Sequence, residues 1–516
     1  MQRSQYLPFL IMVLFFISCE NQEIDKPNIV LIMGDDIGFS DLGCYGSEIQ
    51  TPNLDKLAEN GIRFRTFYNS AKCNPSRSSL LTGLYKGNNR AVNLAALLDS
   101  AGYLTIHSGK EHFDSWVPQQ CYAEHAFQQS FTFWATTEYF IPPKGDFSRP
   151  FFLNGKQLQT VEIDNNSEPF YKTDVTTDYA IRFLDQNRSP DKPFFLYLPY
   201  HAAHYPLQAK PEDIEKYRGN YLIGWDSIRQ NRYDRMIEMG LIDDRYLLSE
   251  PSDNINRFRG HPKGDSIRRS QIPKYRPWNT LSELEKDELD LEMAVFAAMV
   301  DCMDQNIGRI INWLKENDEY DNTLIMYMSD NGSCPYDQNR NFDYPPGPAE
   351  SFRSLSAAWA NAGNTPFRYF KQFGHEGGAH THFIVHWPEK IRKGVITNQV
   401  GHITDVYPTL LEAAGIPYSN EINRTKTIPL HGSSLMPILL GQKRPEPEYF
   451  ISGYSERFRM FRTDGHKIVK ANARNWELYN IIEDPTEINN LADQKPDIVS
   501  QLSNRYQQVI MKINAD

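Results

Sequence analysis

The chain has 516 residues, of which 40% are hydrophobic, 23% charged and 13% aromatic. This composition excludes a disordered, collagen-like or low-complexity protein and supplies enough large side chains for a sizeable core. The formal net charge of −11 argues against duplex nucleic acid as a partner, because binding to phosphates needs a basic surface. Six cysteines are too few for a scaffold built from disulfides. We therefore expect a large, acidic, globular protein that binds no nucleic acid.

The N-terminal segment has the pattern of a secretory signal. Arg3 precedes an apolar run over residues 7–17, which is shorter than the ~20 residues needed to span a bilayer. The residues up to Cys19 resemble a bacterial lipobox, in which Cys19 is lipidated and becomes the mature N-terminus. The alternative is a cleaved signal with an incidental cysteine. We expect residues 1–19 to be a lipoprotein signal peptide, and the protein to be exported and lipid-anchored in a bacterial envelope, at the outer membrane or cell surface, or else periplasmic.

Four continuous apolar runs predict strands that are buried on both faces, as in a parallel sheet covered by helices. They span residues 29–33, 194–198, 323–328 and 383–387. Between them lie helical patterns such as 292–314, where apolar residues recur at spacings of three and four. Strands that alternate with helices predict an α/β fold whose ligands bind at the carboxyl ends of the strands.

Two other segments differ from these strands and helices in composition and in residue pattern. Residues 205–290 are polar and rich in Arg, Asp and Tyr, which predicts a long insertion or a surface layer. From about residue 445 the chain has short alternating segments with Gly and Asp-Pro turns, which predicts a small antiparallel C-terminal unit.

Acidic pairs follow two of the predicted strands. Asp35 and Asp36 come directly after the first strand, and Asp330 and Asn331 follow the third. Such a pair is usually only a turn, but carboxylate and amide oxygens clustered at strand ends are also what Ca²⁺ or Mg²⁺ requires. Two pairs in one α/β chain favour a metal site.

The segment 73–83 carries the most specific motif of the chain. Cys73 begins the pattern Cys-x-Pro-Ser-Arg, which ends at Arg77 and is followed by Leu-x-Thr-Gly. Taken alone, it also fits a buried cysteine beside a helix start, because Pro and Ser are ordinary residues in a first turn. The full match resembles the signature of the type I, formylglycine-dependent sulfatases of the alkaline phosphatase superfamily.

The resemblance covers most of the chain. It continues in blocks that lie in the order of the family, at residues 27–36, 51–55, 109–113, 201–207, 364–371, 375–378 and 476–491. There are departures, since Glu111 and Phe113 replace a commoner Trp and Leu, and residues 379–382 read Ala-His-Thr-His where relatives carry Thr-Pro or Val-Pro. The stretch 85–93 also lacks a loop that many relatives have. These changes put the shape of the substrate pocket in doubt rather than the reaction.

The resemblance implies a fold and two domains. We expect an alkaline-phosphatase-like large mixed sheet sandwiched by helices, followed by a small C-terminal antiparallel sheet with a helix. The catalytic α/β domain would cover residues 27–440, and the C-terminal α+β subdomain residues 441–516.

The resemblance also implies the nucleophile and the cofactors. Cys73 would be oxidised to formylglycine (3-oxoalanine) by a formylglycine-generating maturation enzyme and hydrated to a gem-diol, which attacks sulfur. One Ca²⁺ per chain would be bound by the modified residue together with Asp35, Asp36, Asp330 and Asn331.

The remaining roles rest on the same blocks. Arg77 would hold the diol, while Lys110 and Lys371 would bind the sulfate. His112 would take the proton that ejects sulfate, and His204 with Lys371 would protonate the leaving oxygen. His375 and His382 are weaker candidates for a substrate contact. No role is assigned to Cys44, Cys121, Cys302 and Cys334.

The expected reaction is hydrolysis of sulfate monoesters on carbohydrates. Sulfated oligosaccharides from algal ulvan or carrageenan, and host glycosaminoglycans, are all consistent with an exported enzyme. The stretches 131–134 and 232–235 could line a sugar pocket, although ordinary packing explains them equally well. The alternatives are a phosphate or phosphonate monoester hydrolase of the same superfamily and an inactive glycan-binding lipoprotein.

Overall fold

The structure is a computed structural model that describes residues 26–515, except 87, 89, 114–116, 135–136, 164–168, 252–275, 341, 420, 423–424, 453–457 and 472–474. The predicted signal peptide, with Cys19, lies outside the described residues. Within the described part of the chain, no helix is both long and apolar enough to cross a membrane.

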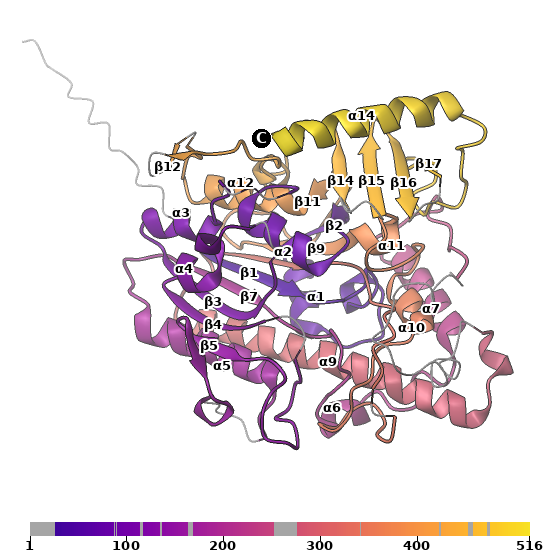
Figure 1. Cartoon of the computed structure of the whole chain (residues 1–516), viewed down its shortest axis with the longest axis horizontal. Coiled ribbons are helices and arrows are strands. Elements are labelled where there is room, and N and C mark those ends of the chain that lie inside the picture. Colours follow the sequence, from indigo (N-terminus) through magenta and orange to yellow (C-terminus); the bar gives the residue numbers. More distant parts are fainter. Residues whose placement is uncertain are drawn as a thin grey trace, which may run out of the picture.

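A large mixed sheet forms the centre of the molecule (Figure 1). Its strand order is β10-β2-β9-β8-β1-β7-β3-β4-β5-β6, with β11 paired to β2. The strands are β1 (Asn28–Gly34), β2 (Ile62–Tyr68), β3 (Leu104–Glu111), β4 (Gln129–Trp134), β5 (Phe151–Leu153), β6 (Lys156–Leu158), β7 (Phe194–Pro199), β8 (Thr323–Ser329), β9 (His380–His386), β10 (Val395–Thr397) and β11 (Gly401–His402). The central strands β8, β1, β7, β3 and β4 run parallel, so their carboxyl ends meet at one edge.

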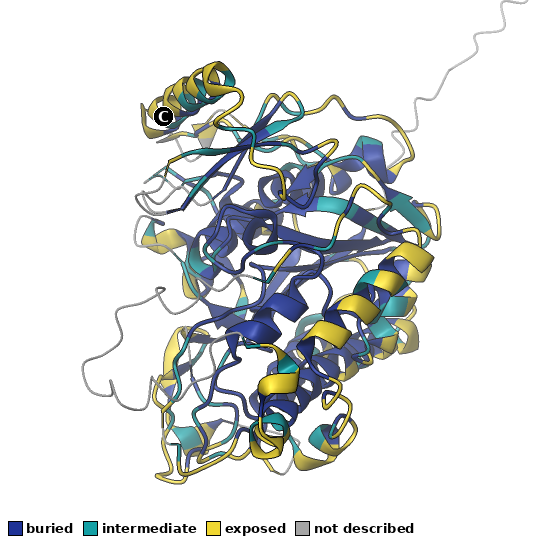
Figure 2. Ribbon diagram, turned by 90° about the vertical axis from the view of Figure 1, so that its right-hand side faces the viewer, coloured by how far each residue is buried: buried dark blue, intermediate teal, exposed yellow. Residues whose placement is uncertain are grey.

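Helices cover both faces of this sheet. Side chains of β1 alternate between the two layers, because successive residues of a strand point to opposite faces. Val30 and Ile32 join the core under α1 (Pro52–Glu59), α5 (Lys172–Asn187), α7 (Trp225–Glu238), α9 (Glu283–Glu316) and α10 (Ala357–Gly363). Leu31 and Met33 join the core under α2 (Cys73–Thr82), α3 (Leu94–Ser100), α4 (Ala123–Ala126), α12 (Ile403–Ala413) and α13 (Met436–Leu439). Figure 2 shows the central strands of the sheet buried, with exposed residues on the outer faces of the helices.

A second, antiparallel sheet lies beside the large one. It consists of β14 (Phe450–Ser452), β15 (Phe458–Thr463), β16 (His466–Ala471) and β17 (Glu477–Asn480), and α14 (Pro496–Ala515) packs on its outer face (Figure 1). On the inner face, Met460 and Tyr479 pack against Tyr68 and Ala379 of the large domain. The predicted fold class is therefore confirmed, whereas the domain boundary at residue 440 stays a prediction.

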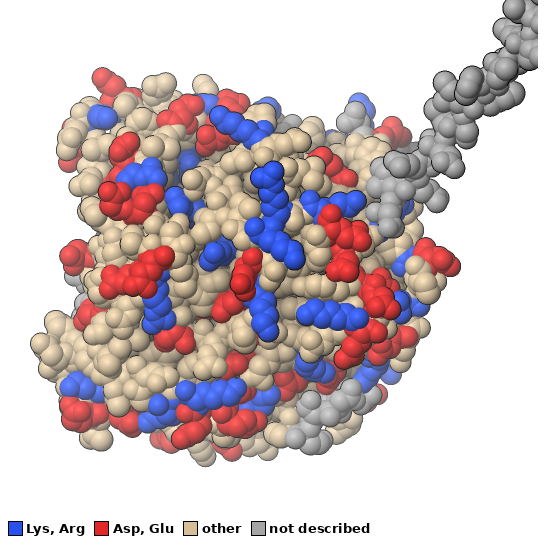
Figure 3. Space-filling view, turned by 180° about the vertical axis from the view of Figure 1, so that it is seen from behind, with Lys and Arg blue, Asp and Glu red and all other residues tan. Residues whose placement is uncertain are grey.

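The remaining elements are short. Besides 3-10 turns, the described residues add α6 (Pro211–Glu215), α11 (Glu376–Ala379) and a hairpin of β12 (Glu421–Ile422) and β13 (Thr425–Lys426). On the face seen in Figure 3, Lys and Arg are interspersed with Asp and Glu, so the acidic net charge is not gathered into one patch there.

Two expectations about the fold need correction. The run 383–387 forms most of β9, which is antiparallel to both of its neighbours although it is buried on both faces. Residues 205–250, within the predicted insertion or surface layer, also contribute to the core. Helix α7 buries Trp225 completely, and its Arg232 is fully enclosed in ion pairs with Asp41 and Glu48.

Candidate active site

The two acidic pairs meet at the carboxyl edge of the sheet, as predicted. Asp35 and Asp36 follow β1, Asp330 and Asn331 follow β8, and all four side chains are buried. Asn331 Nδ2 donates to Asp36 Oδ1 over 2.7 Å, and the backbone N–H of Asp36 donates to Asp330 Oδ1 over 3.3 Å. The parallel pairing of β1 with β8 sets this arrangement, since Gly34 and Ser329 are register partners.

The donor set of this cluster fits a divalent cation. Among the described residues, Asp35 Oδ1, Asp36 Oδ2 and Asn331 Oδ1 are buried without a hydrogen-bond donor. Buried acceptors are costly when unpaired, and hard cations bind carboxylate and amide oxygens of this kind. Ligand atoms of Asp35, Asp36 and His204 also lie within 4.8 Å of one another, close enough to share one ion.

Three cations surround the carboxylates. Lys110 Nζ contacts Asp35, Lys371 Nζ contacts Asp36, and Arg77 Nε donates to Asp330 Oδ2 over 2.9 Å. Burial by itself raises the pKa of Asp35 and Asp36, but the neighbouring lysines and His204 outweigh it and hold both values low. Burial and the Asp35 charge raise the pKa of Asp330, against the effect of Arg77. The buried site thus sets three cations against the three carboxylates.

Cys73 lies within reach of a neutral imidazole. It is the first residue of α2, where the positive end of the helix dipole favours an anion. Its Sγ is 3.3 Å from His112 Nδ1. Burial lowers the pKa of His112 to about 3, helped by Lys110 and Arg77, so the ring is neutral at pH 7 and can accept a proton.

His204 is held in one orientation beside Asp36. Its Nδ1 lies 2.8 Å from the carbonyl oxygen of Tyr205, which can only accept, so Nδ1 carries the ring proton. Its Nε2 is 3.5 Å from Asp36 Oδ2, and burial lowers the pKa of His204 to about 3. The structure therefore brings together all the predicted site residues from Asp35 to Lys371.

A buried layer beneath the site was not predicted. Lys172 of α5 contacts His201 Nδ1 at 2.8 Å and donates to the carbonyl oxygen of Thr137 over 2.7 Å. Burial lowers the pKa of Lys172 well below its ordinary value. The ring of His201 stacks on Tyr139, with centroids 5.0 Å apart, and lies equally far from the His204 ring. No local signal marks Lys172, because a single lysine in a helix usually faces solvent.

Cys334 is a second residue that sequence reasoning left without a role. The buried thiol follows Asp330 by four residues, and both Asp36 and Lys371 act on its pKa, which burial raises. All five cysteines of the described part of the chain are free and buried.

Two weaker candidates do not point to a substrate. His375 bonds Glu477 of β17 at 2.9 Å, and His382 stacks on Tyr327 in the core, with centroids 5.2 Å apart. Both rings are fully buried. In the stretch 131–134, only Trp134 is exposed, at 44%, whereas Phe131 and Phe133 are core residues.

Comparisons with known proteins agree with these motifs. A family model described as sulfatase matches residues 27–416, and one described as N-sulphoglucosamine sulphohydrolase, C-terminal, matches residues 366–512. An uncharacterized sulfatase of Schizosaccharomyces pombe is 30% identical, with 93% of this chain and 92% of that protein covered. An N-acetylglucosamine-6-O-sulfatase of Bacteroides thetaiotaomicron is 26% identical over 92% of this chain and 84% of its own length.

A solved structure extends the likeness to three dimensions. Ps i-CgsB in complex with k-i-k-neocarrahexaose superposes with a TM-score of 0.66 and 25% identity, covering 94% of this chain and 92% of its own. The sulfatase model covers most of the described chain, including Asp35, Cys73 and Lys371. The chain therefore belongs to the sulfatase family of the alkaline phosphatase superfamily and is a sulfuric ester hydrolase.

Proposed function

We propose that the protein removes sulfate from sulfated carbohydrates, using formylglycine at position 73 and one Ca²⁺. The observation that carries the proposal is the contact between Cys73 Sγ and His112 Nδ1, 3.3 Å apart, in a site that also holds Arg77, Lys110 and Lys371. The names of a relative that acts on N-acetylglucosamine 6-sulfate and of a neighbour bound to a carrageenan-type hexaose support a carbohydrate substrate.

The two cofactors would supply what the encoded side chains lack. A thiol that forms a covalent sulfate ester needs a second external attack for release, whereas a gem-diol has one hydroxyl to attack sulfur and another to expel sulfate. A bound Ca²⁺ would neutralise sulfate oxygens and lower the pKa of the diol. Asp35, Asp36 and Asn331 would hold the ion through the oxygens that lack donors, and Asp330 would join them through a carboxylate that already accepts from Arg77 and from the backbone N–H of Asp36.

The chain's own residues would then place the ester and move protons. Lys110 and Lys371 bind the sulfate oxygens and stabilise the charge that develops on them. His112, neutral at pH 7, accepts the proton whose loss releases sulfate from residue 73. His204, whose Nδ1 is held by the carbonyl oxygen of Tyr205, would protonate the leaving oxygen together with Lys371 only after its Nε2 has taken up a proton, because the ring is neutral in the substrate-free site.

Replacing the nucleophile tests this function directly. Cys73→Ala should abolish turnover of 4-nitrophenyl sulfate, with thermal unfolding close to wild type because the side chain is small and lies at a helix start. In active wild-type protein, mass spectrometry should find the peptide with Cys73 about 18 Da lighter than encoded, the change from thiol to aldehyde. Turnover near wild type in Cys73→Ala would rule the mechanism out.

The substrate anion is tested on the same protein. Rates on 4-nitrophenyl sulfate and 4-nitrophenyl phosphate separate a sulfatase from a phosphate or phosphonate monoester hydrolase, and loss of rate on calcium chelation separates both from a binding protein.

We further propose that a formylglycine-generating enzyme matures the chain and that Cys19 carries a lipid anchor in a bacterial envelope. Labelling with a fatty-acid analogue, lost in Cys19→Ala, tests the anchor.

A further inference from the structure

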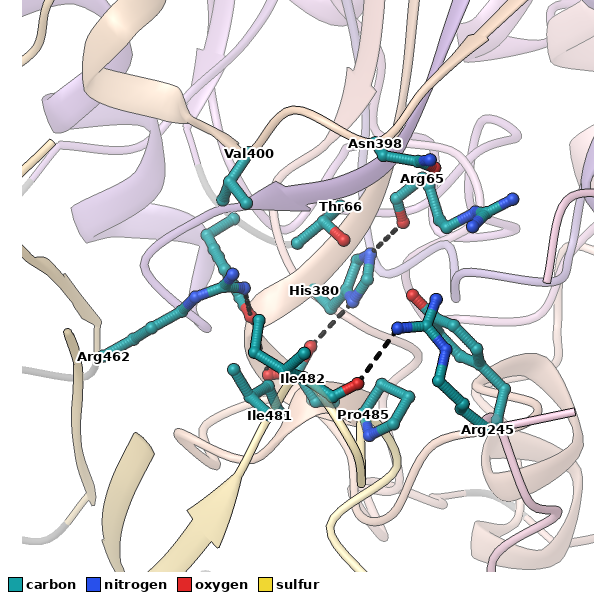
Figure 4. Close-up of a pocket in the computed structure, with 13 residues that line it drawn as sticks. Arg65, Thr66, Arg245, His380, Asn398, Val400, Arg462, Ile481, Ile482 and Pro485 are labelled. Atoms are coloured by element: carbon teal, nitrogen blue, oxygen red, sulfur yellow. Dashed lines mark hydrogen bonds and ion pairs between the residues drawn. The ribbon is translucent and has the colours of Figure 1, made fainter. Parts of the chain in front are cut away.

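A pocket of about 270 Å³ lies between the large sheet and the small C-terminal sheet. Figure 4 shows its walls, which include Arg65 of β2, His380 of β9, Arg462 of β15 and Arg245 after α7. The chain after β17, residues 481–485, closes the remaining side. None of the predicted catalytic or metal-binding residues lines this pocket, so it is separate from the site described above.

Arg462 is a nearly buried cation whose charge is only weakly balanced by a carboxylate. Its side chain is 8% exposed and lies over the rings of Tyr68 and Phe450, 5.5 and 6.0 Å from their centroids. It donates to the Tyr68 hydroxyl over 2.8 Å. Among the described residues, the only carboxylate within 4.0 Å is that of the exposed Glu446, at 3.8 Å. A buried guanidinium with so weak a counter-charge favours an anionic ligand.

On the opposite wall of the pocket, two more guanidinium groups share a single carboxylate. Arg65 and Arg245 share Asp243, with nitrogen–oxygen distances of 3.3 and 2.7 Å. The Nε of Arg65 is buried and has no acceptor among the described residues. One carboxylate shared by two guanidinium groups leaves this wall with an excess of positive charge. Arg245 is 44% exposed and places its guanidinium at the pocket between Asp243 and the carbonyl oxygen of Ile482 (Figure 4).

The floor of the pocket adds no free negative charge. Its one carboxylate, Glu376, is already paired with Lys467. The ring of His380 contacts Glu376 through Nδ1 and the carbonyl oxygen of Arg65 through Nε2, at 2.7 Å each. The cations around the pocket therefore outnumber the carboxylates.

We propose that this pocket is a second binding site for a sulfate-type oxyanion. Three guanidinium groups carry forked N–H donors, which match the oxygens of a sulfate group, and the burial of Arg65 and Arg462 strengthens the attraction. The volume suits one such group, or one sulfated sugar ring. The anion comes either from released sulfate or from a second sulfate group of the saccharide chain, since both present the same oxygens.

Calorimetric titration with sodium sulfate, in a phosphate-free buffer, tests the site in the full chain without any turnover. Arg65→Gln and Arg245→Gln each remove one charged donor and should weaken sulfate binding about tenfold. Arg505→Gln is the matched control, because Arg505 is likewise an ion-paired arginine, bound to Glu448 and Asp464, but does not line the pocket. Thermal unfolding checks each variant, and the exposed Arg245 keeps the test open if Arg65→Gln fails to fold.

A second titration with a sulfated carrageenan oligosaccharide separates the two sources. If the saccharide supplies the anion, the pocket variants weaken its binding as well as that of free sulfate; if released sulfate does, only free sulfate is affected. Equal sulfate affinity, or none, in wild type and both pocket variants would overturn the proposal. Failure to hydrolyse 4-nitrophenyl sulfate would instead count against the proposed function, because the titrations need no catalysis.

Discussion

At the scale of single residues, Glu111 is a carboxyl group that the fold holds away from water. It lies between Lys110 and His112, is 4% exposed, and accepts a hydrogen bond from the backbone N–H of Ala123 over 2.9 Å. Burial raises its pKa from 4.5 to about 8, and the like charge of Glu124 adds to this. Between these two pH values the folded chain keeps a proton that the unfolded chain loses, so stability falls as pH rises from about 4.5 to 8.

We predict that Glu111→Gln removes this pH dependence. The amide keeps the size and the acceptor of Glu111 but cannot ionise, so the variant should gain stability over wild type by up to about 1.4 kcal/mol per pH unit. The gain should begin near pH 5 and level off above pH 8. Urea unfolding at pH 5, 7, 8 and 9 measures it. Parallel stability profiles for the two proteins would show that Glu111 is ionised in the folded state.

At the scale of elements, one buried lysine joins the two sheets. Lys467 of β16 is fully buried, contacts Glu376 of α11, and lies 2.8 Å from the carboxylate of Glu487. Lys467→Met leaves both carboxylates buried without the ammonium group that they share, which should cost about 3–5 kcal/mol of unfolding free energy. The matched control is Lys470→Met on the same strand, whose amine lies 5.8 Å from the Trp476 ring at the surface and should cost about 1 kcal/mol or less. Similar losses in the two variants, measured by urea unfolding, would contradict this account of the interface.

The same elements show what the sequence could and could not predict. Asp35 and Cys73 could be predicted because each is marked by a local pattern. Asp35 follows directly on a buried strand, and Cys73 begins a short, specific motif. The direction of β9 is not, because a run buried on both faces looks the same in parallel and antiparallel pairing. The pocket of Arg65, Arg245 and Arg462 is not predictable either, since the three arginines come from distant segments that meet only through sheet packing. The burial of Lys172 could not be predicted for a related reason, since it depends on how α5 lies on the sheet.

At the scale of the whole molecule, the C-terminal unit supports the loop that carries Lys371. Arg368 donates to the Tyr479 hydroxyl over 2.9 Å and to the carbonyl oxygen of Glu487 over 2.6 Å. The backbone N–H of Glu376 donates to Glu487 over 2.8 Å. The two family matches overlap over residues 366–416, the stretch that contains this loop. The small sheet therefore helps to hold Lys371 in position, although it contributes no predicted catalytic residue.

We predict that a chain ending at residue 440 loses turnover of 4-nitrophenyl sulfate. Removing residues 441–516 leaves Arg368 and Glu376 without these partners and exposes the apolar face around Tyr68 to water. Lys371 then loses its fixed position, and the exposed apolar surface favours aggregation. Dye binding to exposed apolar surface and loss of rate should appear together. The control is a full chain cut at a protease site placed in the exposed segment 441–443, where both pieces remain and packing should hold them together with near-normal turnover. Full activity in the truncated chain would mean that residues 27–440 form an independent catalytic domain.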